Sequence, residues 1–295
     1  KKILIHDTHL EEDTASLDHY NDYSLLDYNR CGVPLLETVT EPCIGSADEA
    51  VTFLEELRNI FLYCDASEAR SDRGQIRCDV NVSLMDEDAT ELGVKVEMKN
   101  INSFKSLEDA INYEIERQAE VLDEGGKIVQ ETRTWNPERG ITQSMRSKEE
   151  AHDYRYMPEP DLPPIITSAE EIEEFRRSLP ELPDARRARL TTEFGLSDYD
   201  AGIITSSRAM AEYFDEVVRA GADPKIAANW IMGDLSKNLN AEGLTIEQSP
   251  VEAKRLAQML ALIDKGTISG KIAKTVFVEM WKSPDSPEKI VADKG

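Results

Sequence analysis

The sequence predicts an α+β protein in which a strand-rich, antiparallel region is followed by an all-helical region. Three observations support this prediction. Apolar and polar residues alternate in segments 74–84 and 93–100, as they do in half-buried strands. Beyond residue 165, apolar residues recur at helical spacing. Between the two regions, residues 154–164 hold four prolines in eleven residues, which indicates an extended linker.

The individual elements follow from periodicity and capping signals. Further strands are expected at 3–10, 35–41 and 128–135. Ser46 and Glu49 form a capping-box pattern before one helix, and a longer helix is expected at 103–123, ended by Gly125 and Gly126. The predicted buried stripe of that longer helix is Phe104, Leu107, Ile111, Ile115, Ala119 and Leu122. In the second half, Ser168 and Ser197 resemble N-caps, and helices are expected at 184–193, 210–220, 224–239, 250–264 and 272–282.

The charge of the chain is unevenly distributed. The 295 residues contain 58 Asp plus Glu against 34 Lys plus Arg, a net charge of −24. Residues 251–295, however, carry eight basic and six acidic residues. The acidic balance argues against a general nucleic-acid coat, and any polyanionic partner is expected at the C-terminal end. We predict domains at residues 1–165, 166–248 and 249–295.

Cysteine usage and hydropathy point to a reducing compartment. The four cysteines match no zinc or redox spacing, so buried free thiols are expected. No apolar run approaches the ~18 residues of a membrane span, and no signal peptide is recognisable. We therefore predict a cytoplasmic protein without a membrane partner.

The two alternating segments place polar side chains on one wall of a predicted antiparallel hairpin. These side chains are Arg77, Asp79, Asn81, Glu97 and Lys99. Mg²⁺ prefers carboxylate oxygens and water, whereas Arg and Lys bind phosphate, so the wall suits a site for Mg²⁺ and a nucleotide phosphate. The alternative is the ordinary solvated face of an antiparallel sheet, with cross-strand pairs such as Lys99–Asp79.

Several longer motifs resemble one known family. They are HLEED (9–13), LLDYNRCGVPLLETVTEP (25–42), RCDVNVSL (77–84), KVEMKNINSF (95–104), QETRTW (130–135), SMRSKEEAHDYRYMPEPDLP (144–163) and GTISGKIAKTVF (266–277). In this order they are similar to the B subunits of aspartyl/glutamyl-tRNA amidotransferases, the GatB family. The resemblance covers nearly the whole chain.

The resemblance implies a carbon–nitrogen ligase that takes its nitrogen from glutamine. Such subunits use ATP and Mg²⁺ to phosphorylate the side-chain carboxylate of Glu-tRNA(Gln) or Asp-tRNA(Asn). Ammonia from a glutaminase A subunit then displaces the phosphate, and a small C subunit completes the complex. The implied fold is a β-rich cradle related to glutamine synthetase, a helical domain and a tRNA-binding tail. An N-terminal part of the cradle and the end of the tail are expected to be missing, which would leave this chain inactive alone.

The resemblance also suggests roles for individual residues. Glu11 and Glu12 face opposite sides of an extended strand, so one of them is expected to face the hairpin wall. The resemblance implies that Glu12 is the Mg²⁺ ligand, and a rim of surface acids is the alternative. Other predicted metal ligands are Glu11, Asp79 and Glu97, with Glu37 and Glu41 as possible contributors. Arg77 and Lys99 are predicted catalytic cations, and Arg133 and Asn81 are predicted to bind the cofactor. Arg146, Lys148 and Arg155 are alternative cations, although each is more often a surface ion-pair partner.

The remaining signals are weaker. The segment 266–271 imitates a phosphate loop but follows a helix and lacks the hydroxyl residue, so it is interpreted as a flexible basic connection. Within it and just beyond, Lys271 and Lys274 are predicted to contact tRNA phosphate. His9, His19 and His152 are interpreted as structural or surface residues, and Trp230 and Trp281 as core residues.

Two other functions fit the same sequence. One is a non-catalytic tRNA-binding or assembly subunit, which absence of metal binding would favour. The other is the archaeal E subunit, which has a large additional domain before the helical region. The direct passage from the linker into helices argues against the E subunit.

Overall fold

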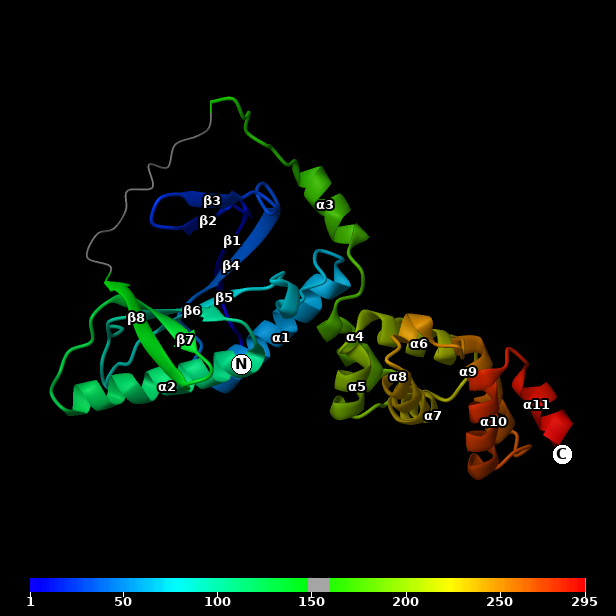
Figure 1. Ribbon diagram of the computed structural model, residues 1–295. Coiled ribbons are helices and arrows are strands. Elements are labelled where there is room, and N and C mark those ends of the chain that lie inside the picture. Colours follow the sequence, from blue (N-terminus) through cyan, green and yellow to red (C-terminus); the bar gives the residue numbers. More distant parts are fainter. Residues whose placement is uncertain (148–159, 295) are drawn as a thin grey trace. The chain divides into compact units, whose positions relative to one another are not determined.

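The computed structural model describes residues 1–147 and 160–294 and divides into two compact units (Figure 1). Unit 1 comprises residues 1–55 and 71–154, and unit 2 comprises residues 56–70 and 155–295. Strands lie in unit 1 and most helices in unit 2, which confirms the predicted α+β class. The division falls near the predicted linker, of which residues 154–159 lie outside the described residues.

The described part of unit 1 contains three small sheets. Its strands are β1 (Ile5–Glu12), β2 (Ser16–His19), β3 (Ser24–Asp27), β4 (Pro34–Thr40), β5 (Cys78–Val82), β6 (Val96–Ile101), β7 (Glu131–Asn136) and β8 (Ile141–Ser147). β1 pairs with β4, β2 pairs with β3, and the other four form one sheet in the order β5-β6-β7-β8. The sequence predicts β1, β4, β5, β6 and β7. It misses β2 and β3, which are only four residues long, and β8, which lacks regular alternation.

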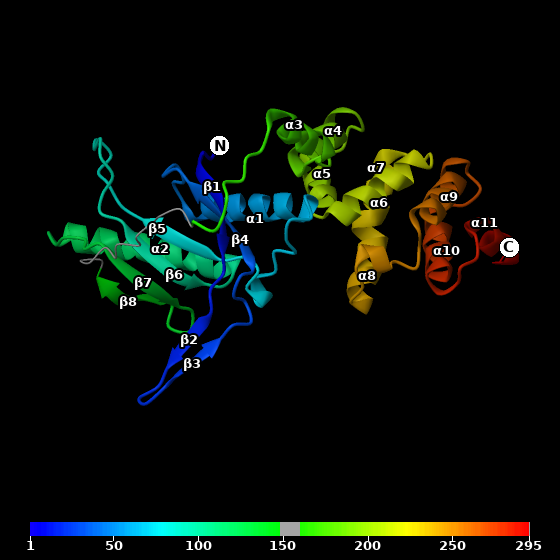
Figure 2. The same ribbon diagram turned by 90° about the horizontal axis from the view of Figure 1, so that it is seen from above.

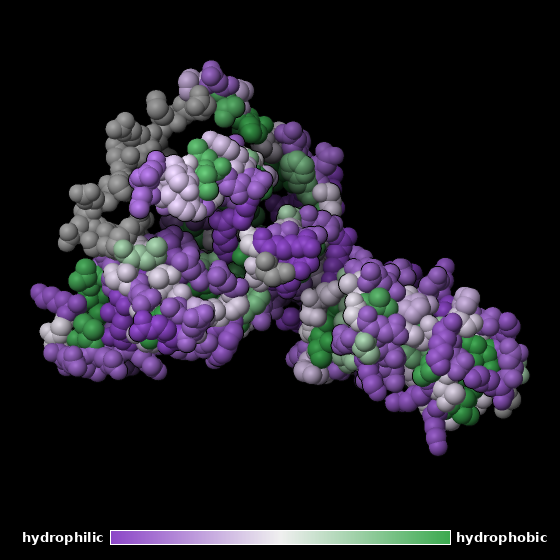
Figure 3. Space-filling view, viewed as in Figure 1, coloured by the Kyte–Doolittle hydropathy of each residue, from purple (hydrophilic) through white to green (hydrophobic). Residues whose placement is uncertain are grey.

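The β2–β3 hairpin extends from unit 1 with its side chains exposed (Figure 2). Leu17 pairs with Leu26, and the rings of Tyr20 and Tyr23 stack at a centroid distance of 4.9 Å. In Figure 3 this hairpin is pale and partly green against a mostly hydrophilic surface. Cross-strand pairs, and not burial, therefore order this hairpin.

One pair in the four-stranded sheet is parallel, which differs from the antiparallel sheet expected. Strands β6 and β7 run in the same direction, because helix α2 (Phe104–Asp123) returns the chain from the last residue of β6 to the end of the sheet at which β6 begins. Ser103 caps α2 by accepting a hydrogen bond from the backbone N–H of Ser106. Leu107, Ala110 and Ile111 of α2 pack in one core with Val82, Met98 and Trp135 of the sheet.

The face that α2 buries is more polar than predicted. Leu122, expected in the stripe, is 43% exposed, whereas Glu114 and Gln118 are completely buried. The Glu114 carboxylate accepts hydrogen bonds from Arg117, Gln118 and Thr142, and the Thr142 hydroxyl in turn accepts one from Arg133 at 2.7 Å. We call these five residues the α2 network. It joins α2 to β7 and β8 by polar contacts in a place where an apolar stripe is expected.

A β-bulge at Asn100 reverses the alternation of β6. Cys78 pairs with Ile101 and Val80 with Met98, so Asp79 faces two residues of β6. Asn100 has φ of +63°, a left-handed conformation that Asn tolerates better than most residues. The bulge returns Ile101 to the core, where it is 6% exposed, and the Asn100 amide donates a hydrogen bond to the Thr134 hydroxyl.

All four cysteines are free thiols, as predicted, but Cys31 is exposed and the other three are partly buried. Burial, with a smaller contribution from Asp79, raises the pKa of the Cys78 thiol to about 11. The Cys78 thiol is therefore protonated and unreactive at neutral pH.

The described part of unit 2 is helical. Its helices are α3 (Ala169–Ser178), α4 (Pro183–Thr192), α5 (Asp198–Thr205), α6 (Arg208–Arg219), α7 (Pro224–Trp230), α8 (Ser236–Glu242), α9 (Ala253–Asp264), α10 (Gly270–Lys282) and α11 (Pro287–Lys294). Ser168 and Ser197 cap α3 and α5 as predicted. The last turns of α1 (Ala47–Tyr63) also belong to this unit, where the Tyr63 hydroxyl donates to the Thr205 carbonyl at 2.9 Å.

A π-helical turn at Ile231–Leu235 interrupts the continuous helix expected at 224–239. The Ser236 hydroxyl donates to the carbonyl of Ile231 at 2.6 Å and so satisfies one backbone acceptor that the wider turn displaces. Two short 3₁₀ turns, Ser71–Arg73 in unit 1 and Ile246–Gln248 in unit 2, complete the regular structure.

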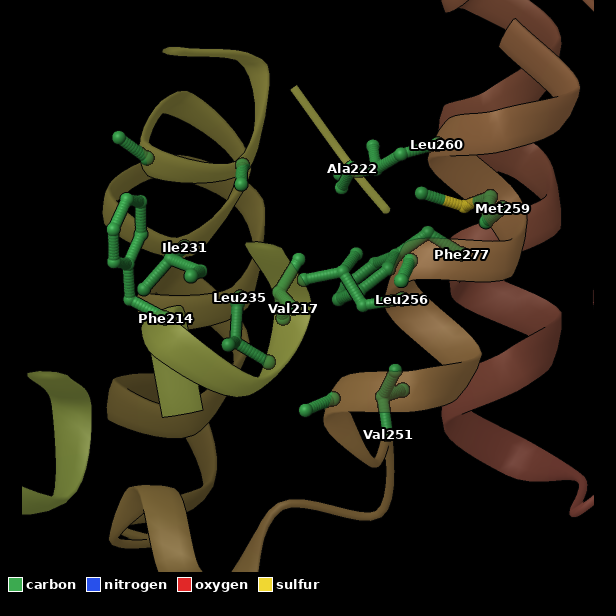
Figure 4. Close-up of a cluster of buried hydrophobic side chains, with 14 of the residues drawn as sticks. Phe214, Val217, Ala222, Ile231, Leu235, Val251, Leu256, Met259, Leu260 and Phe277 are labelled. Carbon is green, nitrogen blue, oxygen red and sulfur yellow. The ribbon is translucent and has the colours of Figure 1, made fainter. Parts of the chain in front are cut away.

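A single hydrophobic core runs through unit 2. Phe214 of α6 lies beside Ile231, and Val217 of the same helix faces Leu256 of α9 and Phe277 of α10 (Figure 4). Trp230 and Trp281 are partly buried against this core, in line with their prediction as core residues. The core contains residues on both sides of the predicted boundary at 248–249, so those two segments pack together.

We predict that Glu114→Ala destabilises the protein by about 3–5 kcal/mol, because Arg117 and Arg133 would keep their buried charges without this carboxylate. Urea unfolding of the full chain, with hydrogen exchange at α2 and β7, measures the change. The control is Glu116→Ala on the exposed side of the same helix, which should shift stability by no more than about 0.5 kcal/mol. Equal effects of the two substitutions would contradict the role of the α2 network.

Candidate functional site

The sheet β5-β6-β7 presents polar side chains on the face opposite α2. Register pairs Asn81 with Glu97 and Glu97 with Thr132, and residues paired in this way point to the same side. We call this side the polar face; its residues are Asp79, Asn81, Glu97, Lys99, Thr132 and Thr134. The structure thus brings together four of the predicted site residues. Thr132 and Thr134 complete the face, and sequence reasoning missed both.

Lys99 bridges the two carboxylates of this face. Its Nζ lies 2.6 Å from Oδ2 of Asp79 and 3.4 Å from Oε1 of Glu97. Burial acts to lower the pKa of the Lys99 ammonium, but its contacts with Asp79 and Glu97 outweigh burial and raise the pKa. The other oxygen of Glu97 accepts a hydrogen bond from the Thr132 hydroxyl at 2.8 Å. The Lys99–Asp79 pair of the alternative interpretation is therefore present, and Lys99 lies where a metal shared by these carboxylates would bind.

Arg77 binds an acid that the sequence analysis did not single out. Its Nη2 lies 3.0 Å from Oδ2 of Asp13, which Arg30 also contacts at 2.8 Å. Burial acts to raise the pKa of Asp13, but the backbone N–H of Thr14 and the guanidinium groups of Arg77 and Arg30 outweigh it and lower the pKa. Arg77 is therefore held next to Asp13, just beyond the end of β1, and its ion pair is separate from the contacts of Lys99 with Asp79 and Glu97. The position of Asp13, directly after a strand and two acids, was the available signal.

Arg133 lies on the opposite face from the predicted site. It is level with Met98 in the β6–β7 register, on the side that α2 covers. Its guanidinium donates to Glu131 at 2.6 Å and to Thr142, and lies 3.7 Å from Glu114. Arg133, predicted to bind the cofactor, therefore lies on the other side of the sheet from Lys99, next to the buried carboxylate of Glu114 on α2.

The acids of β1 form a second cluster with β4. Among the described residues, His9, Glu11 and Glu37 are the group of metal-ligating side chains that come together, with ligand atoms within 4.8 Å of one another. His9 pairs with Glu37 across the strands, and Glu11 lies two residues along the same face. We call these residues the His9 cluster. Glu12 points to the opposite side of β1, so the structure groups Glu11, and not the favoured Glu12, with other ligand atoms.

His9, interpreted from the sequence as a structural or surface residue, contacts three acidic side chains. Its Nδ1 lies 2.6 Å from Asp7, and its Nε2 lies 3.2 Å from Glu11 and 3.1 Å from Glu37. Hydrogen bonds to Glu11 and Asp7 raise the pKa of the His9 imidazole. A proton and a metal ion would therefore compete for this ring. The alternation of polar residues in β1 and β4 was the signal for this cluster in the sequence. The register between the two strands was needed to show which residues meet.

The donor types decide which residues fit Mg²⁺. Mg²⁺ takes one or two carboxylates and keeps several waters, so exposed carboxylates suit it better than an imidazole. Glu11 and Glu37 are 48% and 52% exposed at the side chain and meet this condition. Asp79 and Glu97 supply the same donors but hold the Lys99 ammonium between them. Both pairs fit the ion chemically, and the second would require Lys99 to move.

The predicted tRNA-contacting lysines lie at the start of α10. Ser269 caps this helix by accepting from the N–H of Ile272, Ile268 is 5% exposed, and the segment 266–271 forms a turn that leads into the first residues of α10. Both lysine side chains are exposed, and Lys274 lies 3.5 Å from Asp234. Lys148, His152 and Arg155, together with the side chain of Arg146, lie outside the described residues.

No helix within the described ranges is both long and apolar enough to cross a membrane.

Two known protein families match this chain, one in its first part and one in its last part. Residues 1–173 match the family described as the GatB/GatE catalytic domain, and residues 212–295 match the GatB domain. The chain is 50% identical to the B subunit of the aspartyl/glutamyl-tRNA(Asn/Gln) amidotransferase from Carboxydothermus hydrogenoformans, over 100% of this chain and 62% of that protein. It is 52% identical to the protein of the same name from Geobacter sulfurreducens, over 100% of this chain and 63% of that protein.

The chain thus spans about 62% of the length of the curated relatives that it matches. The catalytic-domain match alone includes the polar face, the His9 cluster and α2, and it extends over more than half of the 295 residues. The chain belongs to the GatB/GatE catalytic-domain family.

Proposed function

We propose that this chain is the ATP-dependent part of a tRNA-dependent amidotransferase, a carbon–nitrogen ligase that takes its nitrogen from glutamine. A carboxylate oxygen of Glu-tRNA(Gln) or Asp-tRNA(Asn) attacks the γ-phosphorus of ATP, and ADP leaves. Ammonia then attacks the activated carbonyl carbon, and phosphate leaves. The ammonia comes from a glutaminase A subunit, with a small C subunit completing a cytoplasmic complex.

The observation that carries the proposal is the polar face, because it combines carboxylates and a cation on a rigid sheet within the matched catalytic domain. The relatives from Carboxydothermus hydrogenoformans and Geobacter sulfurreducens are B subunits, and residues 212–295 match the GatB domain. Both facts favour the B subunit over the archaeal E subunit.

The proposed roles follow from donor chemistry. Glu11 and Glu37, or Asp79 and Glu97, would hold Mg²⁺, which when bound offsets the phosphate charge during phosphoryl transfer. Lys99 would hold the γ-phosphate, and Arg77 a second phosphate or the acyl-tRNA end, because ammonium and guanidinium groups both donate charge-assisted hydrogen bonds to phosphate oxygens. The Asn81 amide, opposite Glu97, would orient water or nucleotide.

The deciding experiment follows amide formation on Glu-tRNA(Gln) by the full-length protein copurified with its glutaminase partner. Ammonium chloride replaces glutamine, so that the glutaminase step is bypassed. We expect product only when both ATP and Mg²⁺ are present. No amidation, despite tight binding of tRNA and partner, would identify a non-catalytic assembly subunit.

The two adjacent acids of β1 separate the metal assignments. We predict that Glu11→Gln raises the Mg²⁺ concentration for half-maximal amidation about 10-fold or more, because one ligand loses its charge. Glu12→Gln leaves the His9 cluster intact and serves as the matched control. It should change the Mg²⁺ concentration for half-maximal amidation less than about 2-fold. A larger effect of Glu12→Gln would restore Glu12 as the metal ligand and exclude the His9 cluster.

We also predict that replacing Lys271 and Lys274 together with Ala weakens tRNA binding and lowers the slope of log affinity against log salt by about one per lysine. Lys282→Ala and Lys294→Ala are suitable controls, because both lysines contact Glu279 within unit 2. Filter binding at several salt concentrations gives the slope. An unchanged slope would remove these lysines from the tRNA contact.

A further inference from the structure

We propose that Thr132 is a positioning residue, whose buried hydroxyl fixes the rotation of the Glu97 carboxylate for cation binding. One oxygen of Glu97 would then point to the position between Glu97 and Asp79, which Lys99 occupies in this structure. This inference rests on the proposed function, in which Glu97 helps to hold the cation used with ATP.

The contact between the two residues is set by the backbone. Glu97 and Thr132 are register partners on the parallel strands β6 and β7, so both side chains leave the sheet side by side. The Thr132 hydroxyl donates to Oε2 of Glu97 at 2.8 Å, while Oε1 lies on the side of Lys99. A hydrogen bond to a carboxylate is stronger than one between neutral groups, and here it separates the roles of the two oxygens.

Burial makes this hydroxyl an effective anchor. Thr132 is 1% exposed, and a buried hydroxyl without a partner costs about 1–3 kcal/mol, so rotation of Glu97 away from Thr132 is unfavourable. Thr132 is also stiff at χ1 because it is β-branched. Its Cα is fixed from the other face, where Arg133 next to it in sequence binds Glu131 and Thr142.

Such an anchor matters because the other two charged groups at this position are open to solvent. Asp79 is 50% exposed and Lys99 34% exposed at the side chain, so solvent competes for both. The Glu97 side chain is 16% exposed, and Thr132 ties it to the centre of the sheet. Outer contacts of this type commonly change metal affinity about 10- to 100-fold when they are removed.

The test compares Thr132→Val, Thr132→Ser and Glu97→Gln in the full-length protein copurified with its glutaminase partner. Valine keeps the shape and β-branching and removes only the hydroxyl, whereas serine keeps the hydroxyl. Thr191→Val, on α4 and outside the polar face, removes a hydroxyl that donates to the Ala188 carbonyl and serves as the control. Electron paramagnetic resonance with Mn²⁺ alone measures cation affinity, and amidation across a Mg²⁺ series separates the Mg²⁺ requirement from kcat at saturation.

We expect Thr132→Val to weaken Mn²⁺ binding and raise the Mg²⁺ requirement about 10-fold, with kcat at saturating Mg²⁺ largely retained. Thr132→Ser and Thr191→Val should stay within about 2-fold of the parent protein. If Glu97→Gln loses cation affinity but Thr132→Val does not, the positioning role is overturned while the proposed function stands. If Glu97→Gln binds Mn²⁺ and amidates normally, Glu97 has no cation role, and both the inference and that part of the proposed site fall.

Discussion

The packing of α2 across one face of the sheet β5-β6-β7-β8 is the constraint on which the candidate site depends. The α2 crossover makes β6 and β7 parallel neighbours, and this brings Glu97 level with Thr132. Because α2 packs on one side, together with residues of α1, the apolar residues of these strands and Arg133 lie on that side. The carboxylates and Lys99 are left on the other side, where they meet solvent and any ligand.

The α2 network gives this packing a single register. A buried ion pair adds little stability compared with well-packed apolar residues, so its presence needs another explanation. A slip of β7 by one residue would send Arg133 to the polar face and place Thr132 and Thr134 beneath α2. Glu114 would then lose Arg133, and Thr132 would lose Glu97. Only the observed register gives Glu114 its contact with Arg133 and Thr132 its contact with Glu97. The geometry of the polar face therefore depends on contacts on the opposite side of the sheet.

The sequence predicted the parts of the site that depend on local alternation. Asp79, Asn81, Glu97 and Lys99 share a face because strand period alone decides it. Local alternation does not show the outcome where a distant residue decides it: Arg133 lies on the core side, next to the buried carboxylate of Glu114 on another element. Likewise, the two-residue period of a strand predicts that Glu11 and Glu12 face opposite sides, but only the register with β4 shows which of them lies near Glu37. The bulge at Asn100 was equally hidden, since its effect is to bring Ile101 back to the core.

The charges of the polar face explain why the proposed reaction would need a divalent cation in addition to Lys99. With all three groups ionised, Asp79, Glu97 and Lys99 together carry a net charge of −1, in a chain whose net charge is −24. ATP and the substrate carboxylate are both anions, and two like charges 4 Å apart near a protein surface repel by about 4 kcal/mol. Lys99 alone cannot reverse the sign of this face, because its charge is already matched by Asp79. One bound divalent ion would change the net charge of the group from −1 to +1 and would also compete with Lys99 for the carboxylates. The ammonium would then be available to phosphate, so the same residues would form a salt-bridged surface without the ion and an anion site with it.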